Sequence, residues 1–166
     1  MRRLCGRDGP RMAVFADVQN VYYTTRDAYG RQFDYRRLWT TLSERGHIVQ
    51  ATAYAIDRGD ERQKKFQSAL THIGFEVKLK PYIQRKDGSA KGDWDVGITI
   101  DVLATAPNVD TIVLLSGDGD FDVLLRTVSV EHGVRTEIYG VAQLTARSLV
   151  DAADAFHPID ERLLLG

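Results

Sequence analysis

Three aspartates occupy alternate positions in the middle of the chain, within residues 111–126. They are Asp118, Asp120 and Asp122, and they follow a four-residue apolar run at 112–115. That run is short and β-branched, which predicts a buried strand. Apolar residues then recur at helical spacing behind the acids. A carboxylate cluster is therefore expected where a buried strand passes into a helix, and in open α/β sheets ligands bind at that edge.

Each of these acids also has a simpler structural interpretation. Asp118 or Gly119 could be the N-cap of the helix, and Asp122 suits its first turn, where the helix dipole favours acids. An EF-hand loop starting at Asp118 is excluded. Val123 stands where that loop needs glycine, and Ser129 stands where it needs a bidentate glutamate.

Two further aspartates point to the same chemistry. Asp17 closes a predicted buried strand at residues 12–16, and Asp95 stands in the first turn of a helix expected from Gly92 to about Ala106. Converging carboxylates repel one another, and a hard divalent cation such as Mg²⁺ resolves that conflict. Such an ion can activate water and stabilise the leaving oxygen of a phosphodiester. We therefore assign metal binding and catalysis to four residues: Asp17, Asp95, Asp118 and Asp120.

Polar neighbours of these aspartates are candidates for supporting roles. Asn20 could donate to a carboxylate or hold a metal-bound water, and it is equally suited to capping its own helix. Ser116 could orient Asp118 or simply turn the chain.

Two other acids lie near Asp95 in the sequence. Asp93 is interpreted first as an acid at a helix N-terminus. Asp101 lies six residues beyond Asp95, about 120° round the helix, so it reaches the same site only if the helix runs across that site.

Several other classes of site are absent from the sequence. There is no Gly-x-x-x-x-Gly-Lys-Ser/Thr loop, and no Gly-x-Gly-x-x-Gly follows the first strand. Val18 and Gln19 follow Asp17, so the second aspartate of haloacid dehalogenases is missing. The four scattered histidines and the single cysteine show no zinc spacing.

Length and composition predict one cytoplasmic domain. The 166 residues are close to the usual domain size, and Cys5 alone permits no intrachain disulfide. No apolar run approaches the roughly 20 residues of a membrane span. Residues 1–11 are basic but have no apolar core, so they do not form a secretory signal.

Charge is distributed unevenly along the chain. Residues 58–91 carry 9 basic and 4 acidic side chains, whereas residues 92–166 carry 4 and 13. A basic segment beside an acidic one suits a protein that binds a polyanion and cations together. Four basic side chains are candidates for binding a nucleic-acid phosphate backbone: Lys64, Arg85, Lys86 and Lys91. The alternative is that these side chains only form a solvated surface.

Alternating strand and helix patterns predict an α/β fold, a three-layer Rossmann-like sandwich around a mainly parallel sheet. Strands are expected at 12–16, 47–56, 75–80, 111–115 and 134–139, and residues 156–159 could add a short last one. Residues 75–80 alternate apolar and charged, which is typical of an edge strand. Residues 81–91 form a loop or a hairpin turned at Asp87-Gly88.

These patterns favour a strand order of 3-2-1-4-5, which makes strands 1 and 4 neighbours at the topological switch point. Asp17 and Asp118 then end adjacent strands, which lie ~4.8 Å apart, so the two carboxylates could share one ion.

Three segments together resemble the motifs of the NYN domain, a PIN-like nuclease domain, and its bacterial LabA-like branch in particular. They are Phe15-Ala-Asp-Val-Gln-Asn20, Lys91-Gly-Asp-Trp-Asp95 with Asp101, and Ser116-Gly-Asp-Gly-Asp-Phe121. The resemblance spans residues 11–160, with 1–10 expected as a flexible tail and 161–166 as a C-terminal tail. It implies a PIN-like sheet and Mg²⁺- or Mn²⁺-dependent ribonuclease activity at the four assigned aspartates, supported by Asn20 and Ser116.

The sequence therefore predicts an endoribonuclease that acts on RNA with a divalent metal. The main alternative is a regulatory module that keeps the acidic pocket, binds RNA or a protein and turns over little or nothing. A metal-binding phosphatase of small molecules comes third. A homodimer or another protein partner is left open.

Overall fold

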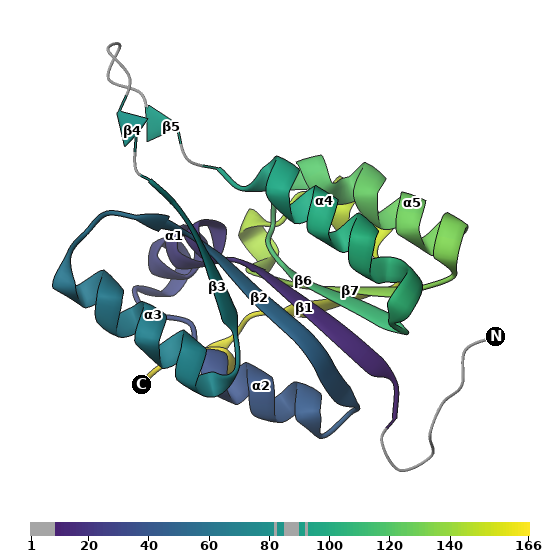
Figure 1. Cartoon of the computed structure of the whole chain (residues 1–166), viewed down its shortest axis with the longest axis horizontal. Coiled ribbons are helices and arrows are strands. Elements are labelled where there is room, and N and C mark those ends of the chain that lie inside the picture. Colours follow the sequence, from purple (N-terminus) through teal and green to yellow (C-terminus); the bar gives the residue numbers. More distant parts are fainter. Residues whose placement is uncertain (1–8, 82, 85–89, 92) are drawn as a thin grey trace.

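The computed structural model describes residues 9–81, 83–84, 90–91 and 93–166, and within them a twisted sheet with helices on both faces (Figure 1). The six strands run in the order β3-β2-β1-β6-β7-β8, with every neighbouring pair parallel. The strands are β1 (Arg11–Asp17), β2 (His47–Asp57), β3 (Glu76–Pro81), β6 (Thr111–Leu115), β7 (Arg135–Gly140) and β8 (Ala155–Pro158). The predicted α/β class and five-strand order are confirmed, and residues 155–158 add the sixth strand.

The central strand β1 has both faces covered. Val14 and Ala16 pack into the core on one side of the sheet, and Ala13 and Phe15 pack into the core on the other. A strand buried on both faces needs a continuous apolar run, as residues 12–16 provide. This double burial fixes the sheet as the middle of three layers.

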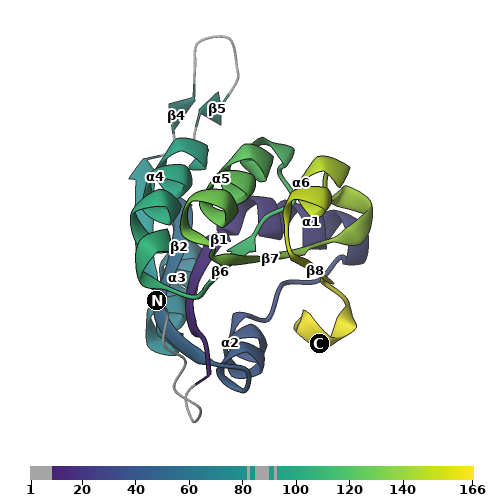
Figure 2. The ribbon, with the colours of Figure 1, turned by 90° about the vertical axis from the view of Figure 1, so that its right-hand side faces the viewer.

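One layer contains α1 (Val18–Tyr29), α2 (Tyr35–Ser43) and α3 (Glu61–Ile73), and the other contains α4 (Asp95–Thr105), α5 (Asp122–His132) and the short α6 (Arg147–Ala152). Figures 1 and 2 show α4 and α5 side by side on their face of the sheet. Caps set several helix ends. Asp34 and Asp60 accept hydrogen bonds from backbone N–H groups at the starts of α2 and α3. Gly30 ends α1 in the left-handed conformation, with φ 63°.

Short elements connect the layers. Four 3-10 turns are present among the described residues: η1 (Ala106–Asn108), η2 (Gly119–Phe121), η3 (Ala142–Leu144) and η4 (Glu161–Leu163). Strands β4 (Ile83–Gln84) and β5 (Ala90–Lys91) pair antiparallel, so the hairpin alternative for residues 81–91 is the correct one. Its expected turn at Asp87-Gly88 lies outside the described residues.

Three helix starts differ from the sequence expectation. Helix α1 follows β1 directly and begins at Val18, before Asn20. Helix α4 begins at Asp95 rather than Gly92. It follows Trp94, whose indole N–H donates to the carbonyl of Ala55 in β2. The helical pattern of residues 144–153 predicts one helix, but α6 begins only at Arg147, because the N–H of Ala146 donates to the carbonyl of Gly117 instead of continuing a helix.

Where the structure describes them, the residues near both ends of the chain make contacts with the folded domain. Residues 1–8, with Cys5, lie outside the described residues, and the carbonyl of Pro10 accepts from the N–H of His47. At the other end Leu163 and Leu164 are buried in the core beside α2. The residues expected as a C-terminal tail therefore pack on the fold, because they have apolar surface to bury.

Within the described part of the chain, no helix is both long and apolar enough to cross a membrane.

Candidate metal centre

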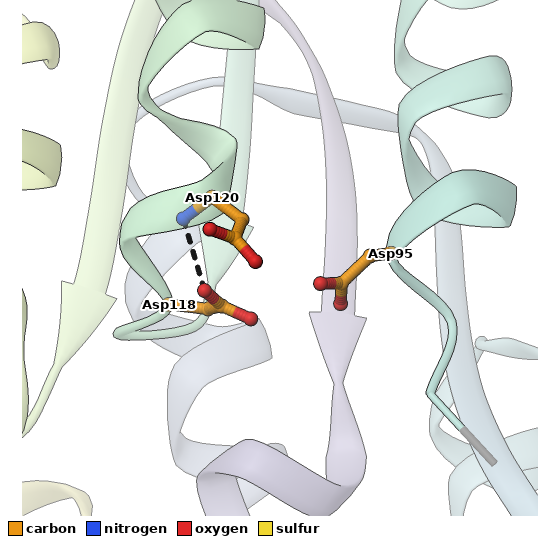
Figure 3. Close-up of side chains that lie close together, drawn as sticks. All are labelled: Asp95, Asp118 and Asp120. Atoms are coloured by element: carbon orange, nitrogen blue, oxygen red, sulfur yellow. Dashed lines mark hydrogen bonds between the residues drawn. The ribbon is translucent and has the colours of Figure 1, made fainter. Parts of the chain in front are cut away.

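Three carboxylates converge where β1 and β6 end. Asp95, Asp118 and Asp120 can each place one oxygen within 4.8 Å of the others. Figure 3 shows Asp95, at the start of α4, facing the two aspartates of the β6–α5 turn. Three acidic oxygens from two elements are a donor set that hard cations such as Mg²⁺ prefer.

Asp118 acts as a helix cap and also faces Asp95. Its Oδ1 accepts a hydrogen bond from the N–H of Asp120 at 2.9 Å, which caps η2. Its second oxygen points toward Asp95 in Figure 3. The two interpretations of Asp118 therefore hold together, since each uses a different carboxylate oxygen.

The turn that carries Asp118 packs tightly against a distant loop. A Cβ at Gly117 would lie 2.8 Å from the carbonyl oxygen of Leu144, and a Cβ at Gly119 would lie 2.9 Å from the Cβ of Ala146. Both are closer than real Cβ contacts, so only glycine fits without displacing the loop. The sequence motif contains both glycines, but it does not reveal the loop that requires them.

Asp17 lies deeper, at the end of β1, with 9% of its surface exposed. Its Oδ2 accepts from the hydroxyl of Ser116 at 3.2 Å, and the same hydroxyl oxygen accepts from the N–H of Asp118 at 3.2 Å. Burial raises the pKa of Asp17 to about 6, against the nearby N–H of Asn20 and the Ser116 hydroxyl, which lower it. Ser116 thus links the two strand ends that the sequence predicted to be neighbours.

Asn20 joins the same two strand ends from α1. Its side-chain oxygen accepts from the N–H of Gly117 at 2.9 Å. Asn20 therefore positions the β6–α5 turn and does not cap its own helix, where Asp17 occupies the N-cap position.

The carboxyl of Asp95 has a raised pKa. Burial raises its pKa to about 7, and the negative charges of Asp118 and Asp93 add to the effect. The side chain of Asp93 accepts from the N–H of Asp95 at 3.2 Å, so Asp93 sits at the helix N-terminus as expected. The centre thus gathers more negative charge than its own hydrogen bonds offset, and a divalent cation would supply the missing charge.

Trp94 fixes the start of α4 and thereby Asp95. Its indole N–H donates to the carbonyl of Ala55 in β2 at 2.9 Å, and the ammonium of Lys80 lies 4.5 Å from its ring centroid. The same ammonium donates to the carbonyl of Asp93 at 3.0 Å. This anchor is not predictable from the sequence, in which the only signal is an aromatic residue beside a helix start.

Two predicted supporting acids are engaged elsewhere. Asp101 accepts from the hydroxyl of Tyr54 at 2.7 Å and from the ammonium of Lys78 at 2.8 Å, so it ties α4 to β2 and β3. Asp122 accepts from the N–H of Val123 and lies 4.0 Å from Arg126, as an acid in the first turn of α5. The structure brings neither into the group of three carboxylates.

The predicted RNA-binding residues are described only in part. Lys64 is exposed and lies 3.9 Å from Glu61 on the same helix. Arg85 and Lys86 lie outside the described residues, and Lys91 belongs to β5 with its side chain outside them. Their role stays a prediction.

Comparison with known proteins agrees with this architecture. The model of the NYN domain matches residues 11–160. The chain is 30% identical over 161 residues to the low amplitude and bright protein LabA of Synechococcus elongatus, covering 91% of this chain and 84% of that protein. An uncharacterized protein of Methanocaldococcus jannaschii is 27% identical, covering 93% of this chain and 58% of its own length.

Solved structures show the same fold. The crystal structure of a Vibrio parahaemolyticus protein of unknown function superposes with a TM-score of 0.91 at 48% identity, covering 98% of this chain and all of that chain. Ribokinase from Giardia lamblia, at 9% identity and a TM-score of 0.50, shares the fold alone.

Proposed function

The chain belongs to the NYN domain family, and we propose that it is an endoribonuclease that hydrolyses RNA phosphodiester bonds with Mg²⁺ or Mn²⁺. Proteins of this family are generally metal-dependent nucleases. The observation that carries the proposal is the convergence of Asp95, Asp118 and Asp120 at the carboxyl ends of the central strands.

In this proposal the carboxylates share the task of holding the cation. Asp95, Asp118 and Asp120 supply the oxygen ligands, and Asp17 adds a fourth carboxylate on the buried side. Once bound, the cation would activate water and stabilise the leaving oxygen of the phosphodiester.

The surrounding contacts hold these groups in place before substrate arrives. Ser116 bonds to Asp17 and to the backbone of Asp118, Asn20 bonds to the turn, and Trp94 anchors the helix that carries Asp95. Ligands fixed in this way need little reorganisation during the reaction, which is the main source of electrostatic catalysis.

Cleavage of a panel of end-labelled single-stranded and stem-loop RNAs tests the proposal. The purified protein is assayed with Mg²⁺, with Mn²⁺ and with EDTA, beside Asp118→Asn. Asp151→Asn is the matched control, since it removes the same charge from an exposed side chain of α6 that pairs with Arg147. We expect EDTA to stop cleavage, Asp118→Asn to slow it by about 100-fold or more, and Asp151→Asn to cleave like the parent.

Two results would contradict the proposal. Cleavage that survives EDTA or the Asp118→Asn change does not come from this centre. A parent protein that binds metal and RNA but cleaves none of the panel is instead the regulatory module considered above.

A further inference from the structure

A groove lies between α1 and α3, and the proposed function leaves it unused. Its volume is about 630 Å³, within the range of roughly 300–1,000 Å³ typical of ligand pockets. Its walls come from α1, from the end of β2 and from the start of α3. Both helices pack on the same face of the sheet.

The groove adjoins the end of β1, where Asp17 lies. Two of its lining residues, Val18 and Gln19, directly follow Asp17. On its floor lies Tyr35, whose pKa is raised first by burial and then by the negative charge of Asp17. A chain that passes the end of β1 near Asp17 could therefore continue into this groove.

The charge of the groove is opposite to that of the metal centre. Its described lining includes four basic side chains and one acidic one: Arg26, Arg58, Arg62, Lys65 and Asp60. The carboxylate of Asp60 is already occupied, because it accepts from the N–H of Gln63 and caps α3. Among the ion pairs of the described residues, neither Arg62 nor Lys65 takes part. These cations suit a polyanion.

Aromatic rings give the groove faces on which a base could stack. Tyr22 is 47% exposed, and its ring lies edge-on to Tyr23 with centroids 5.3 Å apart. The guanidinium of Arg26 lies 4.8 Å from the centre of the Tyr23 ring. Exposed rings beside a guanidinium are the usual platform for unpaired bases.

The floor of the groove is mainly apolar. Tyr35, which is 6% exposed, contributes its ring to this floor. Phe33 and Phe66 supply apolar surface around it.

We propose that this groove binds the single-stranded RNA segment that flanks the cleaved phosphodiester. Phosphates contact Arg58, Arg62 and Lys65, and one unpaired base stacks on Tyr22. The inference rests on the proposed ribonuclease function for the identity of the strand. An acidic peptide would match the cations, but its carboxylates would not stack on the exposed ring of Tyr22 as a base would. RNA is therefore favoured.

Binding is measured without cleavage, by fluorescence anisotropy of a labelled 12-nucleotide single strand in EDTA across a salt series. The double variant Arg62→Ala/Lys65→Ala removes two groove cations. The matched control is Arg36→Ala/Arg37→Ala, which removes two exposed cations of α2 that do not line the groove. We expect the groove variant to bind about 10-fold more weakly and to lower the salt slope by about 2, with the control near the parent.

Tyr22→Ala tests the stacking platform separately from charge. We expect it to weaken single-strand binding by about 5-fold or more and to leave binding of a blunt RNA duplex unchanged, since paired bases cannot stack on it. Thermal melts of each variant confirm that the fold is intact, and the exposure of the substituted side chains makes that outcome expected.

The outcomes separate this inference from the nuclease proposal. Groove variants that bind the single strand like the parent, or no more weakly than the α2 control, overturn the groove even if cleavage is normal. If the groove variants bind the single strand more weakly than the parent but the parent never cleaves RNA, the groove is supported and the nuclease proposal is contradicted. Binding of a poly-glutamate peptide that exceeds RNA binding and is lost in the groove variants also overturns the RNA assignment.

Discussion

Ser116 is the residue on which the geometry of the candidate centre depends most directly. It donates to Asp17 and accepts from the N–H of Asp118, so one hydroxyl sets the relation between the ends of β1 and β6. A hydroxyl can do both at once because it has one donor and two acceptor sites. From the sequence, Ser116 could either orient Asp118 or turn the chain, and its contacts favour orientation.

At the residue scale, Asp17→Asn should stabilise the metal-free protein at neutral pH. The folded state raises the pKa of Asp17 from 3.8 to about 6, chiefly through burial. The native state then binds this proton more tightly than the unfolded chain does. The contribution of Asp17 to the free energy of unfolding therefore falls as pH rises from about 4 to about 6. A shift of this size corresponds to at most about 3 kcal/mol, which asparagine avoids.

Urea unfolding in EDTA at pH 4.5, 6 and 7.5 measures the effect. The gain in unfolding free energy from Asp17→Asn should be small at pH 4.5 and largest at pH 7.5, whereas Asp151→Asn should show no such trend. A variant less stable than the parent at pH 7.5 would mean that the hydrogen bond to Ser116 needs the carboxylate and outweighs its burial cost.

At the scale of elements, α4 decides where Asp95 lies. The helix is held by Trp94 on Ala55, by Lys80 on the carbonyl of Asp93 and by the Tyr54–Asp101 contact. These partners come from β2 and β3, which precede α4 by many residues. Helical periodicity predicted the helix itself, but pairings across the sheet depend on strand register, which local patterns do not contain.

Gly97→Ala should weaken metal binding by disturbing this anchor. Alanine normally stabilises a helix by about 0.5–1 kcal/mol relative to glycine. Here its Cβ would lie 2.6 Å from Cε3 of Trp94, so the indole must move away from Ala55. Loss of an orienting contact of this kind typically costs about 10-fold or more in metal affinity.

Calorimetric titration of Mn²⁺ compares this variant with Ala104→Gly, an exposed change near the other end of α4. The Ala104→Gly protein should lose about 1 kcal/mol of stability and keep its metal affinity. Equal affinities in parent and Gly97→Ala would show that Asp95 does not depend on the Trp94 anchor.

At the scale of the whole molecule, the alternation of apolar runs with helical stripes was sufficient to predict the sheet order. Both patterns are local, and right-handed crossovers leave few ways to assemble them. Side-chain partners from distant segments were not predictable in this way. Glu137 illustrates this, because it is 1% exposed in β7 and bonds to Arg45, Arg135 and His157.

The candidate site likewise has a part that local sequence patterns predict and a part that they do not. The positions of Asp95, Asp118 and Asp120 follow from where strands end and helices begin, and the sequence placed them correctly at one edge. The expectation that Asp17 and Asp118 share one ion rested on strand spacing alone. The structure sets Asp17 back against Ser116, outside the group of three, because strand spacing does not determine where a side chain points.

The last prediction concerns the folded molecule as a whole: Mg²⁺ or Mn²⁺ should raise its melting temperature. A ligand that binds only the native state at 100 times its Kd adds about 2.7 kcal/mol, which for a chain of this size corresponds to a shift of about 5–10 °C.

The shift should be smaller at pH 6 than at pH 8, because a carboxyl with a pKa of about 7, such as Asp95, must lose its proton before it can bind metal. Scanning calorimetry at both pH values, with and without metal, measures this. Asp118→Asn should lose most of the increment and Asp151→Asn should keep it. A melting temperature that is unchanged at 10 mM of either ion would contradict both the metal centre and the nuclease mechanism that depends on it.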